Sequence, residues 1–338
     1  MSTVNEMEKT NIAPYSSWTK PLLWGEGVRA ALCMLPMAVS FILGNFSLMI
    51  PLGQGGFYYS SLPLPESRGK RLLVGFLLIG LGLGFYLMGG NVSTNLWLAV
   101  LFSFVVGFNL VVLVGWEVLG LVALSYVTVY SAGLNTGDPQ KAHTYFFAFI
   151  LSIMWGLLLS LLPTWKGQKS VVSEPPTKRT LATTGIRMGV GMAVAVAVAG
   201  VLEFSKLGWA PSGVANSVRF DWESSKIKGF LRGAGTVGGA LLVIVIFLFT
   251  TNIVYLAIIS YVSGVLNGLF KQTKIGAMPF FYTATILIIY SLGDISKGPE
   301  LAIQRIIYNL LGVFIALFVV WYPFPIIMKK LNNAIKVE

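Results

Sequence analysis

Two short apolar segments carry the residues with the clearest capacity for chemistry. They span residues 50–56 and 210–216, and their candidate groups are Pro51, Gly53, Gln54, Pro211, Gly213 and Asn216. We expect regular helix to fail in both segments, because proline removes a backbone donor and glycine weakens a helix. Backbone freed at membrane depth cannot face lipid, so it would line a cavity where its N–H and C=O groups bind a solute. Two kinked helices in a packed bundle are the alternative.

Three arginines near the ends of apolar segments supply cationic groups. Arg29 and Arg187 open the first apolar segment of each half of the chain, and two facing guanidinium groups would attract a carboxylate in bidentate geometry. Arg219 follows the second of the two proline-containing segments. Together these side chains would gather an ionised acid at the cytoplasmic entrance. Simple anchoring of the helices at the cytoplasmic interface is the alternative.

Arg232 begins a further pattern, in which Gly235, Thr236 and Gly239 follow at i+3, i+4 and i+7. These spacings place the four residues on one helix face. The glycines predict close packing against another helix, and Thr236 can hydrogen-bond across that contact. Arg232 either extends to the cytoplasmic interface or supplies a fixed positive charge to an anion path.

Aromatic residues flank the two proline-containing segments. Phe57, Tyr58 and Tyr59 follow the first segment, while Trp209 precedes the second and Phe220 follows it. A flat ring would find apolar partners among these side chains without a charged pocket. The alternative is an aromatic belt at the membrane interface.

Titratable groups that could couple transport to protons are few. Asp138 and Asp294 are the candidates, and both lie near the expected outer ends of helices. In the alternative interpretation Asp294, Glu300 and Arg305 form a local ion pair at the mouth. The single histidine, the single cysteine and the lack of clustered carboxylates predict no catalytic residue, no metal site and no cofactor.

The composition identifies the solvent of most of the chain as lipid. Of 338 residues, 55% are hydrophobic and 11% are charged, which excludes an ordinary soluble domain. Ten segments approach the roughly 20 apolar residues that span a bilayer: 28–44, 72–90, 95–115, 117–134, 145–163, 186–202, 230–249, 252–270, 276–293 and 304–323. Residues 45–62 and 208–221 are weaker, broken segments. The basic residues bracket these segments, so the net charge of +11 indicates topology and not nucleic-acid binding.

An internal repeat is indicated by displacing the chain by about 160 residues. The displacement pairs Pro51 and Gly53 with Pro211 and Gly213. It also pairs Tyr130, Ser131, Gly133, Pro139, Ala142 and Pro163 with Tyr290, Ser291, Gly293, Pro299, Ala302 and Pro323. Because these matches include prolines and glycines at helix boundaries, they predict a duplication.

The distribution of basic residues then favours parallel halves. With twelve crossings and a cytoplasmic N-terminus, 20 Lys and Arg residues lie inside and 4 outside, and removing the two weak crossings gives 14 and 10. We therefore expect an all-α integral membrane protein of about twelve transmembrane helices, built as two parallel six-helix repeats with a broken second helix in each. Its parts are a cytoplasmic N-terminal segment (1–27), the first repeat (28–163), a cytoplasmic linker (164–184), the second repeat (185–325) and a cytoplasmic tail (326–338).

The run Trp209-Ala210-Pro211, followed by a basic loop and the Arg232 pattern, resembles the fusaric acid resistance protein family, also called aromatic acid exporters. Plant aluminium-activated malate transporters are similar in the same stretch. The resemblance is sharpest over 208–323. The first half departs from it, since residues 71–75 lack the Gly-Thr pair, and the sequence has no large helical cytoplasmic domain of the kind that many members carry.

The resemblance implies efflux of aromatic carboxylates, or anion conduction as in the plant proteins. The expected function is export of small organic anions by alternating access driven by an ion gradient, in the cell membrane, with both termini cytoplasmic. An organic-anion channel and a membrane assembly or scaffold protein are the alternatives, and an enzyme is not expected. The expected partners are the lipid bilayer and the anion, not nucleic acid, and a homo-oligomer or an accessory subunit stays open.

The predicted topology can be tested with a cysteine introduced at residue 172, inside the linker. Because positive charge is concentrated there, a membrane-impermeant thiol reagent should label this position only after the cytoplasmic side is exposed. Labelling in intact cells would contradict the parallel-repeat topology.

Overall fold

The computed structural model describes residues 23–62, 65, 67–114, 117–162, 176–271 and 277–321, which fold into helices. The predictions made for the N-terminal residues 1–22, for most of the linker and for the tail 326–338 lie outside the described residues. The first half of the chain forms α1 (Trp24–Cys33), α2 (Leu35–Ile42), α3 (Phe46–Ser61), α4 (Arg68–Val92), α5 (Leu96–Val114), α6 (Glu117–Leu134) and α7 (Pro139–Ser160). The second half forms α8 (Lys178–Val201), α9 (Trp209–Ser217), α10 (Trp222–Phe249), α11 (Ile253–Leu269), α12 (Ala277–Ser291), the 3₁₀ helix η1 (Ile295–Lys297) and α13 (Gly298–Trp321).

Helix length and composition make this a multi-pass membrane protein. Among the described residues, 6 helices are long and apolar enough to cross a bilayer, and the pair α1 and α2, bent by 40°, makes a seventh. The bend follows from Pro36, which lies in the first turn of α2 and cannot continue α1. Large apolar side chains such as Phe249, Ile42 and Trp97 are 86%, 79% and 78% exposed, as expected for a surface that faces lipid.

The expected interruption of helix at the two proline-containing segments is wrong. Pro51 lies inside the continuous helix α3, and Pro211 lies in the first turn of α9, which remains helical through Asn216. Membrane helices tolerate proline where neighbouring helices satisfy the freed backbone groups. The second helix of each half is short instead of broken. At 1.5 Å per residue, the nine residues of α9 extend about 14 Å, less than half of the hydrocarbon core.

Glycines in these short helices serve close packing. Gly55 of α3 lies directly against the Phe149 carbonyl of α7, and Gly56 lies against the Cys33 carbonyl of α1. In α9, a Cβ added to Gly213 would meet the Asn309 carbonyl of α13 at 3.0 Å. Glycine at such positions lets two backbones approach as no larger residue could.

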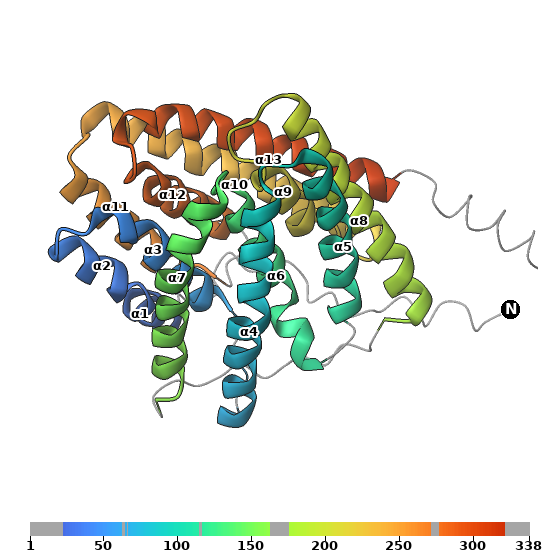
Figure 1. Cartoon of the computed structure of the whole chain (residues 1–338), viewed down its shortest axis with the longest axis horizontal. Coiled ribbons are helices and arrows are strands. Elements are labelled where there is room, and N and C mark those ends of the chain that lie inside the picture. The colour runs from blue at the N-terminus through green and yellow to red at the C-terminus, as the bar shows by residue number, and fades with distance from the viewer. Residues whose placement is uncertain are drawn as a thin grey trace, which may run out of the picture.

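The same helix pairs pack together in both halves. In the first half α4 packs on α6 and α7, and α3 packs on α7; in the second half α10 packs on α12 and α13, and α9 packs on α13. Contacts between the halves join α5 to α8 and α1 to α11. Figure 1 shows α4 and α7 running down the view while α10 and α13 run across its top, so equivalent helices of the two halves lie at a large angle.

The short helices also run in corresponding directions. Ser152 of α7 donates to the Leu52 carbonyl and Tyr59 donates to Ser160, so α3 and α7 are parallel. Helix α9 is likewise parallel to α13, because Trp209 packs near Tyr308 and Gly213 near Gly312. Gly55 lies against the Phe149 carbonyl of α7 and Gly213 against the Asn309 carbonyl of α13, and the displacement of 160 residues pairs Phe149 with Asn309. By these contacts Gly213 corresponds to Gly55, two residues from its sequence partner Gly53.

Replacing Gly239 with Leu should remove most of the folded protein. A side chain at this position would collide with the Phe280 carbonyl of α12, which is backbone and cannot move aside. Overpacking of this kind costs roughly 1–3 kcal/mol or more. The monodisperse fraction in detergent measures the effect. The matched control is Gly84→Leu on α4, where an added Cβ meets nothing within 4 Å. Equal yields of the two variants would contradict the close contact.

Candidate functional site

Two arginines lie buried in the second half of the molecule. Arg232 of α10 is 6% exposed and Arg305 of α13 is 2% exposed. The Arg232 guanidinium lies 5.1 Å from the centre of the Tyr282 ring, and its Nε donates to Asn309 Oδ1 over 3.2 Å. The Arg305 guanidinium lies 4.9 Å from the centre of the Trp209 ring. Aromatic faces therefore hold both cations in place.

The positive charge of this pair is not balanced by protein carboxylates. In the part of the chain that the structure describes, neither arginine forms an ion pair, and the two guanidinium groups are close enough to repel each other. Arg232 Nη2 and Arg305 Nε are buried without a hydrogen-bond acceptor among the same residues. An uncompensated buried charge costs several kcal/mol, so this site favours the binding of an anion.

Helix geometry explains how the pair forms. Arg232 shares a buried face of α10 with Gly235, Thr236 and Gly239, as the spacing predicts, and Gly239 brings α12 against this face. Thr236 does not hydrogen-bond across the contact, because its hydroxyl has no partner among the described residues.

Arg305 contradicts the expectation of a local ion pair at the mouth. It is buried against α9 one turn before Asn309, while Asp294 pairs with Lys297 over 3.6 Å and Glu300 accepts from Gln304 over 2.7 Å. Arg305 was not predicted as a site residue. Its signal was the i, i+4 spacing to Asn309 within an apolar helix, which places both polar side chains on one face.

Aromatic side chains surround a small cavity at Arg305. Tyr58, Trp209, Tyr282 and Tyr290 line it, and its volume of about 10 Å³ is near the space that one water molecule needs. Tyr58 and Trp209, both predicted site residues, are thus brought together from α3 and α9. Trp209 contributes its ring and Tyr290 packs edge-on against it at 5.8 Å.

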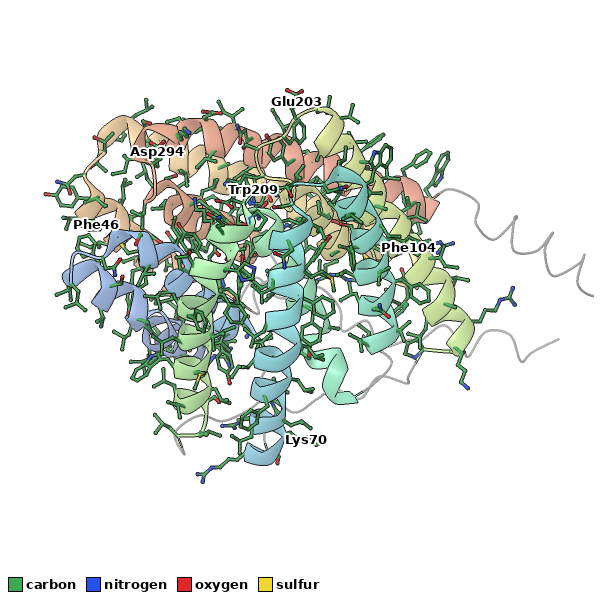
Figure 2. The ribbon with its side chains drawn as sticks, viewed as in Figure 1. Phe46, Lys70, Phe104, Glu203, Trp209 and Asp294 are labelled. Carbon is green, nitrogen blue, oxygen red and sulfur yellow. The ribbon has the colours of Figure 1, made fainter. Side chains whose placement is uncertain are left out.

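A much larger cavity, which we call the vestibule, lies next to the small one. Its volume is about 580 Å³, and it shares Ala132, Asn135 and Tyr290 with the small cavity. The predicted residue Gln54 lines the vestibule as well. Pro51 and Gly53 are buried residues of α3 and are not among the residues that line it. Figure 2 shows Phe46 and Asp294, two vestibule residues, near the periphery and Trp209 in the interior, with Lys70 at the opposite edge of the molecule.

Arg29 does not face Arg187. Arg29 donates to the carbonyls of Ser60 and Leu62 at the end of α3 and pairs with Glu26 over 2.9 Å. Its helix α1 packs on α3, α7 and α11, whereas α8, which carries the half-buried Arg187, packs on α5, α9 and α13. Arg29 therefore satisfies orphan carbonyls at a helix C-terminus, an interaction that stabilises the helix end.

A corresponding contact occurs at the end of α9. Arg219 donates to the carbonyls of Val218 and Asn216 over 2.6 and 3.1 Å, and the Asn216 side chain donates to the Ser212 carbonyl over 2.7 Å. These two predicted site residues thus bind backbone at the C-terminus of α9, away from Arg305, which meets Trp209 at its N-terminus.

The two coupling candidates lie outside the buried site. Asp138 is the N-cap of α7 and accepts from the Gln140 N–H over 2.8 Å. Asp294 lines the vestibule, and a hydrogen bond from Ser296 lowers the pKa of its carboxyl, which keeps it ionised near neutral pH. A proton carrier needs a pKa near the working pH, so this geometry gives Asp294 no such tuning.

Comparison with known proteins identifies one similarity. Residues 193–319 match the family model described as fusaric acid resistance protein-like, and this stretch contains Trp209, Arg232 and Arg305. The predicted resemblance is confirmed over these residues, while the similarity to plant malate transporters stays a prediction. No curated protein matches the chain, and no solved structure does.

Arg305→Gln should separate ligand binding from folding. Because the substitution removes a buried uncompensated charge, we expect the melting temperature of the anion-free protein to stay the same or rise. Benzoate at about 100 times its wild-type Kd would stabilise the wild type by about 2.7 kcal/mol, and a variant that binds about tenfold more weakly by about 1.4 kcal/mol. Thermal unfolding of purified protein with and without benzoate measures both effects. A lower melting temperature without benzoate would show that Arg305 has a structural role.

Proposed function

We propose that the protein moves small organic carboxylates across the membrane, with Arg232 and Arg305 as the groups that bind the carboxylate. The observation that carries this proposal is the burial of two guanidinium groups without a carboxylate among the described residues. Arginine binds carboxylates through paired, charge-assisted hydrogen bonds. The unused nitrogens Arg232 Nη2 and Arg305 Nε supply donors for such bonds.

The surroundings of the arginines favour a substrate with a flat apolar body. Trp209, Tyr282 and Tyr58 present rings beside the cations, and aromatic rings stack on or meet one another edge to face. The match of residues 193–319 to the fusaric acid resistance protein-like model supports a role in efflux across the membrane, and the aromatic acid is our proposal from the rings beside the arginines. Benzoate and its hydroxylated analogues are therefore the first substrates to test.

Access from one side at a time is the mechanism that we propose. The cavity at Arg305 has room for about one water molecule in this structure, so benzoate reaches the arginines only when movement of the two halves widens it. The vestibule reaches the small cavity through the residues that both share, and Arg29, Glu26 and Lys271 close the opposite end of α3. Lys271 of the second half donates to the Leu62 carbonyl over 3.0 Å, so this closure joins the two halves. The matching helix pairs of the halves support a pair of six-helix repeats that rock about the site.

The orientation that we propose rests on the distribution of charge. We propose that the vestibule opens outward and that both termini are cytoplasmic, because this arrangement leaves few basic residues outside. The protein then lies in the cell membrane and exports its substrate. Catalysis has no part in this proposal.

Transport in proteoliposomes tests the function. We expect wild-type protein to move radiolabelled benzoate and Arg305→Gln or Arg232→Gln to reduce the rate at least about tenfold, the effect of losing about 1.4 kcal/mol of binding. The control is Lys226→Gln, since Lys226 is 51% exposed and, among the described residues, its ion pair is with its helix neighbour Glu223. Accumulation of benzoate against its own gradient, when an ion gradient is imposed, identifies a coupled exporter.

Two results would contradict the proposal. Rundown of benzoate with a steady macroscopic current would identify a channel. No movement of benzoate or of aliphatic carboxylates, by protein with a wild-type melting temperature, would rule out anion transport.

A further inference from the structure

The vestibule contains lysines that the buried site does not use. Lys141 of α7, Lys206 of the loop between α8 and α9, and Lys297 of η1 all line it. Lys297 pairs with Asp294, and Glu300 accepts from Gln304, so these carboxylates are engaged. Among the described residues, Lys141 and Lys206 form no ion pair with a carboxylate.

Lys206 is held in position by its neighbours. Its Nζ donates to the Asn135 carbonyl over 3.1 Å and lies 5.4 Å from the centre of the Tyr290 ring. The Asn135 side chain in turn accepts from the Gly208 N–H over 2.8 Å, which fixes the loop that carries Lys206. Because Asn135 and Tyr290 also line the small cavity, Lys206 lies where the vestibule leads to Arg305.

The vestibule is large enough for a bulkier ligand than the buried site can hold. About 580 Å³ is in the range that holds a drug-sized molecule, whereas the cavity at Arg305 has about 10 Å³. Aromatic side chains in the vestibule, Phe46, Tyr86, Tyr145 and Tyr290, provide apolar area for a fused ring system. The wall therefore combines surplus positive charge with aromatic surface.

We propose that the vestibule is a second anion-binding site, centred on Lys206 and Lys141, that takes bulky aromatic anions too large for the pocket at Arg305. Such a ligand binds from the vestibule side without occupying the buried arginines. This proposal does not depend on the proposed transport function, because binding of the anion alone defines the site. An anion bound there blocks the path between the vestibule and Arg305.

The titration of Lys206 supports this assignment. Burial, together with the neighbouring charges of Lys141 and Lys297, lowers the pKa of its ammonium to about 8. The positive charge is therefore present below pH 8 and is lost above it. The other titratable or charged groups that line the vestibule are Tyr86 on α4, Tyr145 on α7, Tyr290 on α12, Asp294 beside η1 and Glu300 on α13.

The probe for the experiment is 1,5-naphthalenedisulfonate, a membrane-impermeant aromatic dianion. Calorimetric titration of full-length protein in nanodiscs at pH 7 should give the same Kd for wild type and Arg305→Gln. Lys206→Gln should raise the Kd at least about tenfold, which corresponds to about 1.4 kcal/mol. Lys206→Arg should bind as the wild type does, because it keeps the charge. The control Lys226→Gln should leave the Kd unchanged.

The pH dependence provides a second readout. Between pH 7 and pH 9 the wild type should lose affinity, since Lys206 deprotonates, whereas Lys206→Arg should lose little. Equal Kd values for the wild type and Lys206→Gln would overturn the proposal. So would loss of binding in Arg305→Gln, which would assign the probe to the buried site. If benzoate transport fails while these titrations succeed, the proposed function is wrong and the vestibule site stands.

Discussion

The interaction on which the site depends is the burial of two like charges in an apolar bundle. Arg232 and Arg305 are held by ring faces and by one amide, and these contacts offset only part of the desolvation. Charge at this depth is tolerated where it faces the bundle interior or a wet cavity. The vestibule and the small cavity supply such surroundings. Binding of the proposed anion would therefore offset the desolvation cost that remains in the empty protein.

The site depends on two short helices that pack closely against their neighbours. Helices α3 and α9 are too short to span the bilayer as straight rods, and their glycines let them pack against α7 and α13 with backbone touching backbone. Asn135 directly follows α6 and accepts from the Gly208 N–H just before α9, and Gln54 lies midway along α3; both line the vestibule. Short helices thus bring loop residues such as Lys206 to the level where the cavities meet.

Much of the fold followed from apolar runs, since a run near membrane length allows little except helix. The packing role of Gly239 also followed from helical spacing. The breaks expected at Pro51 and Pro211 did not form. Pro51 lies inside α3, where tertiary contacts stabilise the helix despite a missing donor, and Pro211 lies in the first turn of α9, where a backbone donor would have no intrahelical acceptor. The roles of Arg29 and Arg305 could not be predicted, since each depends on a partner distant in sequence: the carbonyl of Leu62 and the ring of Trp209.

The buried pair also has an electrical consequence. In the proposed rocking cycle a monocarboxylate would offset one of the two positive charges of the loaded site, whereas the empty site would return with both. Moving one elementary charge through 100 mV changes the free energy by about 2.3 kcal/mol. A membrane potential that is negative inside would favour the state in which the empty, positively charged site faces the cytoplasm and can bind the next anion. Voltage alone would then favour net outward movement, even without a proton to carry.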